Sequence, residues 1–258
     1  MAADPTTSPW ALYDRLIAGI PEDVEAVEAV VNRWAAVRTE EGSLGVAMTY
    51  SQGPKSGLAD WQVRGRRLRE VARCATSWDL RLASLGVAAM NAWYSDPERV
   101  RALPGVEVGA HTNFFTSRGP QLGRVPTAIV GHFSHADQLS GQVTVLERNP
   151  RGNDLPDSAC EYVLPGCQVV AITGSTLVNK TLPRLLELSR RAEVALVGPS
   201  TVPALGAYPD CVRTIHGSVV IDPDEYLRLA TLGLRSHDSA AVEMFRLDLA
   251  PAGQPSGC

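Results

Sequence analysis

The sequence predicts an α/β protein in which a doubly wound parallel sheet follows a small α+β unit. In the second half of the chain, short apolar runs alternate with stretches that have helical spacing. Four of these runs are continuously apolar and then end in glycine or polar residues, which is typical of parallel strands buried on both faces. In the first half, strands precede helices, and this order indicates an α+β unit.

The first half, residues 1–103, contains a clear hairpin signal. The runs "WAAVRT" and "LGVAMTY" flank a Glu-Glu-Gly-Ser turn at residues 40–43, and this pattern predicts two antiparallel strands. A strand at residues 27–32 would complete a small meander. Helical spacing marks "WALYDRLIAGI", which stops at Pro21, and residues 66–75 and 80–94, the last with Ser77 or Asp79 as its N-cap.

Residues 127–240 contain the predicted parallel sheet. A ligand of such a sheet binds beyond the carboxyl ends of the strands. We interpret residues 104–126, which are rich in glycine and polar residues, as a linker between the halves. Residues 241–258 are interpreted as a tail with a disordered end. The predicted strands are "TAIVGHF", "VTVLERN", "VVAITGST", "VALVGPST" and "VRTIHGSVV".

Composition and charge argue against several classes of function. The 258 residues carry 24 basic and 28 acidic side chains, and the basic run "RGRRLRE" has the character of a solvated helix start, so we expect no nucleic-acid partner. No apolar run approaches the ~20 residues of a membrane helix, and "MAADPTTSPW" lacks the features of a secretory signal. Five cysteines without a C-x-x-C predict neither a disulfide framework nor a cysteine zinc site. The expected location is the cytoplasm, with no membrane partner.

The segment "VVAITGSTLVNKTLPRLLELSRR" is one residue away from a phosphate-binding loop. Lys180 and Thr181 stand where G-x-x-x-x-G-K-[ST] requires them, but Asn179 replaces the second glycine. The later strand "VALVGPST" also lacks an acid for magnesium, so a nucleotide-hydrolysing site is disfavoured. A ligand loop of backbone amides and hydroxyls fits better, with Asn179 or Thr181 capping the helix that contains Pro183. The predicted ligand-binding residues of this loop are Thr173, Gly174, Ser175, Thr176, Asn179 and Thr181.

Other strand ends add candidate binding residues. Gly131, His132 and Phe133 follow the first strand, and a single glycine there disfavours a dinucleotide. Glu147 ends the next strand, where doubly wound folds hold the hydroxyls of a ribose. Together these features are compatible with an adenosine-type ligand such as S-adenosylmethionine; the alternative is that Glu147 pairs with a neighbouring arginine at the surface. Asn149, Pro199, Ser200 and Thr201 complete the candidate set.

A pair of histidines raises the question of a metal site. His132 and His135 are three residues apart, and Asp137 follows them. Imidazole together with carboxylate can bind a transition metal, but the sequence shows no clear third ligand. His132 and His135 are therefore the candidate metal ligands, and whether a metal binds stays open.

Two stretches of the chain resemble a known family. "ERNPRGNDLPDSACEYVLPGCQVVAITGSTLVNKTLPRLLELSRRAEVALVGPST", residues 147–201, resembles the carboxyl-terminal domain of a heavy-metal-chelation family, and "SWDLRLASLGVAAMNAWY", residues 77–94, resembles its amino-terminal partner. The similarity extends over residues 10–235, and "ITGSTLVNKTL" and "GPST" are its most specific parts. It implies an enolase amino-terminal-like domain packed on a Rossmann-like domain, with a candidate site in the cleft between them.

These observations leave three functions open. In the first, the cleft binds a small polar ligand or a metal complex, within an enzyme of metal-linked or specialised small-molecule metabolism. His132, Lys180 and Asn91 are then the candidate catalytic residues, and His111 helps to close the cleft. In the second, the enzyme consumes S-adenosylmethionine, by methyl or aminocarboxypropyl transfer or by cyclisation. In the third, the protein is a non-catalytic scaffold.

Cofactors and partners follow from these functions. The sequence does not identify a cofactor; the candidates are a transition metal and S-adenosylmethionine. A sulfonium ligand also needs an aromatic face, for which Phe133, Phe114, Trp10 and Trp93 are candidates. The expected partners are a small-molecule ligand and a second copy of the chain, in a homodimer.

Overall fold

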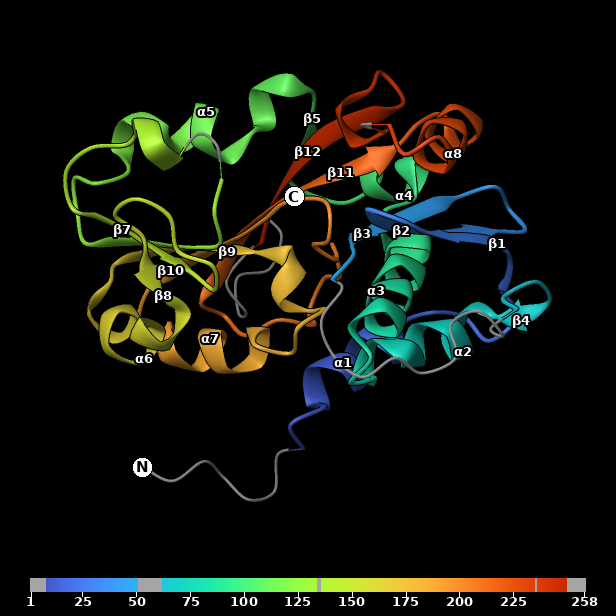
Figure 1. Ribbon diagram of the computed structural model, residues 1–258, viewed down its shortest axis with the longest axis horizontal. Helices are drawn as coiled ribbons and strands as arrows, with labels where there is room; N and C mark the ends of the chain where they lie inside the picture. The colour runs from blue at the N-terminus through green and yellow to red at the C-terminus, as the bar shows by residue number, and fades with distance from the viewer. Residues whose placement is uncertain (1–7, 51–61, 134–135, 235, 250–258) are drawn as a thin grey trace.

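The amino-terminal unit is built on a four-stranded sheet with the order β3-β2-β1-β4 (Figure 1). The computed structural model describes residues 8–50, 62–133, 136–234 and 236–249. The predicted meander is confirmed, because β1 pairs antiparallel with β2 and β2 with β3. The strands are β1 (Glu25–Val31), β2 (Trp34–Thr39), β3 (Leu44–Met48) and β4 (Arg66–Arg67), and the helices are α1 (Ala11–Ala18), α2 (Leu68–Arg73), α3 (Leu80–Tyr94) and α4 (Pro97–Arg101).

Helix α3 packs closely against this sheet. Asp79 is its N-cap, as one of the two predicted candidates, and accepts hydrogen bonds from the backbone N–H groups of Arg81 at 2.9 Å and Leu82 at 3.4 Å. A Cβ atom on Gly45 of β3 would lie only 1.9 Å from the backbone nitrogen of Ala92. The backbones of α3 and β3 therefore approach more closely than any side chain at Gly45 would allow.

The second unit contains an eight-stranded sheet with the order β5-β12-β11-β10-β9-β6-β7-β8. Its central strands are parallel, but β12 is antiparallel to both of its neighbours. The sheet is therefore mixed and mostly parallel. Its strands are β5 (Val106–Val108), β6 (Thr127–Val130), β7 (Val143–Glu147), β8 (Leu155–Pro156), β9 (Val169–Thr173), β10 (Glu193–Val197), β11 (Val212–Val220) and β12 (Val242–Asp248).

The segments that we predicted as linker and tail contribute strands to this sheet. Residues 104–126 contain β5 and the short helix α5 (Phe114–Arg118), and residues 241–258 contain β12. In β12, Phe245 and Leu247 are 1% and 0% exposed, so burial of alternate side chains explains why this segment returns to the sheet. The predicted disorder of the tail's end falls on residues 250–258, which lie outside the described residues.

The helices of the second unit are short and lie on both faces of the sheet. Leu182 and Leu185 of α7 pack in one cluster with Val170 of β9, whereas Phe115 of α5 packs in another cluster with Ala171. Consecutive residues of β9 point to opposite faces, so both faces are covered, as in a doubly wound fold. The helices are α6 (Cys160–Val163), α7 (Leu182–Leu188) and α8 (Pro223–Thr231).

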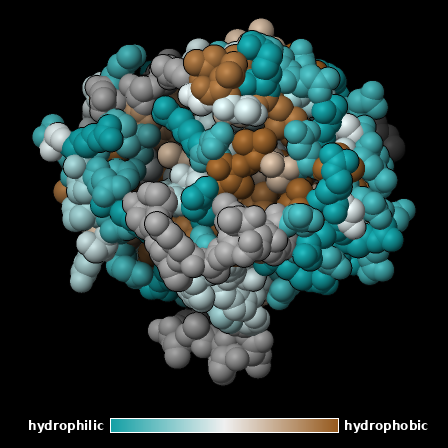
Figure 2. Space-filling view, turned by 45° about the vertical axis from the view of Figure 1, so that its right-hand side comes forward, coloured by the Kyte–Doolittle hydropathy of each residue, from teal (hydrophilic) through white to brown (hydrophobic). Residues whose placement is uncertain are grey.

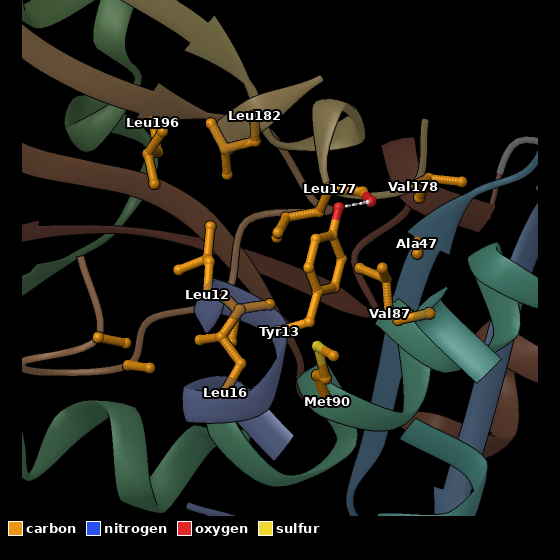
Figure 3. Packing of buried hydrophobic residues seen from close by; sticks show 14 of the residues in the cluster. Leu12, Tyr13, Leu16, Ala47, Val87, Met90, Leu177, Val178, Leu182 and Leu196 are labelled. Atoms are coloured by element: carbon orange, nitrogen blue, oxygen red, sulfur yellow. Dashed lines mark hydrogen bonds between the residues drawn. The ribbon is translucent and has the colours of Figure 1, made fainter. Parts of the chain in front are cut away.

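The two units share one hydrophobic core. Tyr13 of α1 and Met90 of α3 belong to one cluster of buried residues with Leu177, Leu182 and Leu196 of the second unit, and Figure 3 shows Tyr13 directed toward Leu177. The Tyr13 hydroxyl donates a hydrogen bond to the carbonyl oxygen of Leu177 at 2.7 Å, and burial raises the pKa of this phenol. Because the core continues across the junction, the units form a single packed body.

Figure 2 shows one hydrophilic face on which hydrophobic residues gather in a limited area. Ile221, Leu232 and Leu234 are exposed near the two ends of α8. Of the helices within the described ranges, none combines the length and the apolar character that crossing a bilayer requires.

Candidate functional site

A cavity of about 500 Å³ opens at the carboxyl ends of β6, β7 and β9. Strand β6 lies between β7 and β9. From β6 the chain adds β7 and β8 on one side and then β9 and β10 on the other, and this change of side is a topological switch point. The amino-terminal unit contributes Arg33, Met48 and Tyr50 to the wall, which places the cavity at the junction of the units. The second unit contributes Val130, Gly131, His132, Leu146, Glu147, Arg148, Asn149, Arg151, Asp157, Cys160, Thr173, Ser175, Thr176, Asn179, Thr181 and Leu185.

Gly131 allows the loop after β6 to lie against the end of β9. Its φ angle is +105°, and a Cβ atom there would lie 2.8 Å from Cγ2 of Thr173. Both the left-handed backbone and the close approach favour glycine at this position. This arrangement brings the neighbouring His132 and Thr173 to the same cavity.

Glu147 joins the loops that follow β6 and β7. Its carboxylate accepts hydrogen bonds from the backbone N–H groups of His132 at 2.8 Å and of Asn149 at 3.1 Å. The neighbouring Arg148 pairs instead with Asp157, with 3.1 Å between Nε and Oδ2. Glu147 therefore lines the cavity as a bridge between two loops, and its carboxylate is already engaged by the protein.

His132 is oriented by an aspartate that the sequence did not suggest. His132 Nδ1 lies 3.2 Å from Oδ2 of Asp154, whose side chain is 6% exposed. The same oxygen accepts a hydrogen bond from the backbone N–H of Arg151 at 3.1 Å. An ionised Asp154 only accepts hydrogen bonds, so it favours the imidazole form with a proton on Nδ1. The one signal in the sequence was the turn-forming "RGND" at residues 151–154, and this signal does not indicate that Asp154 contacts His132.

Hydroxyl groups from both units meet at the end of β9. The Tyr50 hydroxyl donates to Oγ of Ser175 at 2.9 Å, and this oxygen lies 3.1 Å from Oγ1 of Thr173. Burial raises the pKa of Tyr50, partly offset by the hydrogen bond to Ser175. The phenol is therefore protonated near neutral pH. Thr176 also lines the cavity, but its hydroxyl donates to the carbonyl of Thr173 at 2.7 Å.

Several predicted site residues join the two units and do not line the cavity. Asn91 donates from Nδ2 to the carbonyls of Val46 at 2.9 Å and Pro199 at 3.2 Å. Ser200 accepts a hydrogen bond from the backbone N–H of Met48 at 2.8 Å. Thr201 donates to the carbonyl of Gly198 at 2.8 Å, and a Cβ atom on Gly174 would lie 2.3 Å from the Thr201 nitrogen. The loop after β10 thus serves the junction.

Lys180 points away from the cavity. Its φ angle is +67°, and no other non-glycine residue in the described part of the chain has a positive φ. This turn directs Nζ to the carbonyl of Ser77 and, at 2.9 Å, to that of Val178. Burial lowers the pKa of Lys180 to about 8, against an opposing effect of Asp79. The lysine therefore ties the loop after β9 to the residues before α3.

The loop between Lys180 and helix α7 is shaped by a side-chain turn. Oδ1 of Asn179 accepts hydrogen bonds from the backbone N–H of Thr181 at 3.1 Å and from its hydroxyl at 2.6 Å. Thr181 occupies the N-cap position of α7 but makes no side-chain capping bond. Neither of the two predicted caps therefore accepts a hydrogen bond from a backbone N–H inside α7. Thr181 makes no such bond, and the Asn179 side chain bonds to Thr181.

The proposed metal and aromatic residues do not assemble around the cavity in the described part of the chain. His135 lies outside the described residues, and no group of at least three His, Cys, Asp or Glu side chains within them could hold a metal ion. Phe133 packs against Phe115 with tilted rings, whose centroids are 4.9 Å apart. The remaining aromatic candidates pack elsewhere: Phe114 on His216, Trp10 on Tyr13 and Trp78, and Trp93 under Arg99.

Comparisons with known proteins agree with the architecture. Two family models, both described as "Putative heavy-metal chelation", match residues 13–94 and 113–246. A DUF364-family protein of unknown function from Desulfitobacterium hafniense has 31% sequence identity and a TM-score of 0.84, over 93% of this chain and 98% of that chain. A protein of the same family from Pyrococcus horikoshii has 21% identity and a TM-score of 0.72, over 93% and 99% of the two chains, and supports the fold alone.

No curated protein matches the chain, so the comparisons carry no reaction or ligand. The match over residues 113–246 covers more than half of the chain, and it includes the loops around the cavity. The match over residues 13–94 covers the amino-terminal sheet and α3. The resemblance drawn from residues 77–94 and 147–201 is confirmed. The chain belongs to the DUF364 family, whose description is "Putative heavy-metal chelation", and its amino-terminal unit matches the DUF4213 model of the same description.

Proposed function

We propose that the cavity binds a small polar ligand or a metal complex, and that the protein is an enzyme of metal-linked or specialised small-molecule metabolism. The observation that carries this proposal is the meeting of three strand ends with Arg33 and Tyr50 of the other unit around one cavity. Ligands of doubly wound sheets bind at such switch points. The volume of about 500 Å³ also falls within the range of small-molecule sites.

The polar groups in the cavity suit proton transfer and hydrogen bonding. His132, whose ring is held by Asp154, lines the cavity as a candidate general acid or base for a bound ligand. Thr173 and Ser175 supply hydroxyl groups. Cys160 lines the same cavity, but burial raises the pKa of its thiol to about 11, so it is a protonated and weakly reactive group.

A thermal-shift screen of polar metabolites and metal chelates tests the proposal. A ligand of the cavity should raise the melting temperature of the wild type and do so less for His132→Ala and Thr173→Val. Thr116→Val is the matched control, because Thr116 is exposed and lines a different hollow. An increase that is equal in all four proteins would place the ligand elsewhere and contradict the proposal.

A second candidate is consumption of S-adenosylmethionine by a transferase or lyase. The supporting observation is that Glu147 lines the cavity one strand away from the glycine turn at Gly131. The carboxylate already accepts two backbone hydrogen bonds, and among the described lining residues Tyr50 is the one Phe, Tyr or Trp side chain. Thermal shifts with S-adenosylmethionine and S-adenosylhomocysteine, compared between the wild type and Glu147→Gln, decide this case. An unchanged melting temperature rejects it.

A further inference from the structure

We propose that the ligand is a multiply charged anion with carboxylate or phosphate groups, and that a metal ion enters the cavity as part of an anionic chelate. This inference rests on the proposed function of the cavity as a ligand site. It concerns the charge of the ligand, which the strand-end geometry alone does not specify. Three arginines from the two units carry it.

Two of the three arginines are exposed and have no ion-pair partner among the described residues. Arg33, Arg148 and Arg151 line the cavity. Arg148 is neutralised by Asp157, but the guanidinium groups of Arg33 and Arg151 form no ion pair or side-chain hydrogen bond with any described residue. Guanidinium groups bind carboxylate and phosphate through pairs of parallel hydrogen bonds. Two unpaired guanidinium groups at one cavity therefore favour an anion.

The acidic side chains of the cavity are already engaged by the protein, so they are not available to bind an incoming cation. Asp157 is paired with Arg148, and Glu147 accepts backbone hydrogen bonds from His132 and Asn149. A bare metal ion would have to break these contacts while it meets two positive groups. A chelate that carries its own carboxylate or phosphate donors presents the opposite charge and needs few donor atoms from the protein.

The backbone positions of the two free arginines are fixed by different units. Arg33 lies in the turn between β1 and β2, where its carbonyl accepts from Thr49 N at 3.3 Å and the adjacent Asn32 donates to the carbonyl of Ala230 at 3.0 Å. Arg151 lies in the turn whose backbone N–H bonds to Asp154. An anion bound by both would bridge the units across the cavity. The volume of about 500 Å³ accommodates an organic anion, which is much larger than a single metal ion.

Isothermal titration calorimetry of the full chain tests the charge of the ligand. The probes are citrate, pyrophosphate, nickel ion alone and the nickel–citrate complex; citrate and pyrophosphate separate carboxylate from phosphate recognition. We expect binding of at least one anionic probe, weakened about tenfold in Arg33→Gln and in Arg151→Gln and about a hundredfold in the double variant. Arg190→Gln is the matched control, since Arg190 is an exposed arginine that lines a separate hollow. Its affinity should stay within twofold of the wild type, and salt should weaken binding in the wild type.

Hydrogen–deuterium exchange of the segment 173–181 distinguishes the failure of this inference from that of the proposed function. Protection of this segment by nickel ion alone or by a neutral metabolite, with equal affinity in the arginine variants, would overturn the anionic ligand and leave the cavity as a ligand site. If ligands that raise the melting temperature protect other segments instead, both proposals are wrong. Protection by an anionic probe that is lost in the double variant supports both.

Discussion

Replacing Asn91 by alanine should destabilise the junction of the two units by about 3 kcal/mol. The Asn91 side chain is 1% exposed; it donates to the carbonyls of Val46 and Pro199 and accepts from the hydroxyl of Ser95. Alanine removes all three hydrogen bonds and leaves their partners in a buried setting. At ~1 kcal/mol for each bond, the free energy of unfolding falls by ~3 kcal/mol. For a chain of this length, the melting temperature should fall by ~6–12 °C.

Urea unfolding followed by tryptophan fluorescence measures this loss. Asn149→Ala is the control, because Asn149 is exposed and only its backbone N–H bonds to Glu147. Asn91→Asp keeps the acceptor oxygen but loses both amide donors, so it should cost at least as much as alanine. An unfolding free energy of Asn91→Ala within ~0.5 kcal/mol of the control would refute the assignment of Asn91 as a structural bridge.

Three further outcomes follow from the structure. In urea unfolding, Gly131→Ala should lower the free energy of unfolding by ~2 kcal/mol more than Gly206→Ala. Both glycines have a positive φ, but only at position 131 would the added Cβ atom meet another side chain. Burial lowers the pKa of Lys180 to about 8, so above this pH the unfolded chain binds more protons than the folded protein. The free energy of unfolding of the wild type, relative to that of Lys180→Met, should therefore rise between pH 8 and about 10.5. A difference that does not change with pH would contradict the burial of this amine. Burial raises the pKa of the Cys160 thiol to about 11, so this thiol should react slowly with iodoacetamide. At pH 7.5, peptide mass spectrometry should find its alkylation ~100-fold slower than that of free cysteine. A comparable rate would show that the thiol is exposed.

The elements that could be predicted from the sequence are those with strong local signals. The hairpin between β2 and β3 has two apolar runs around a glycine turn, and α3 has an N-cap and a long run of helix-forming residues. By contrast, β5 spans only Val106–Val108, which is too short for a visible alternation. Strand β12 does alternate, but its partners lie far away in the sequence, so the chain near the carboxyl end could be taken for a tail.

The candidate site could be predicted in part, for a geometric reason. Parallel strands end at one edge of a sheet, so residues after β6, β7 and β9 had to lie near one another, and these segments do line one cavity. The rule does not state where each side chain points. Lys180 has a left-handed backbone that turns its amine to the other unit, and Ser200 is taken up by the backbone of Met48. Asp154 was missed because its contact with His132 depends on the fold of a loop.

The contacts between the units imply that the cavity is formed before any ligand binds. Met48 is the last residue of β3 and Tyr50 follows two residues later; they donate hydrogen bonds to Ser200 and Ser175 of the second unit, respectively. Behind them, one cluster of buried side chains among the described residues continues from one unit into the other. A ligand that enters therefore does not have to order two domains, and its binding energy is not reduced by the entropic cost of closure. Recognition would then depend on the groups already present at the wall, and for this reason we propose that the guanidinium groups of Arg33 and Arg151, which pair with no described residue, select the charge of the ligand.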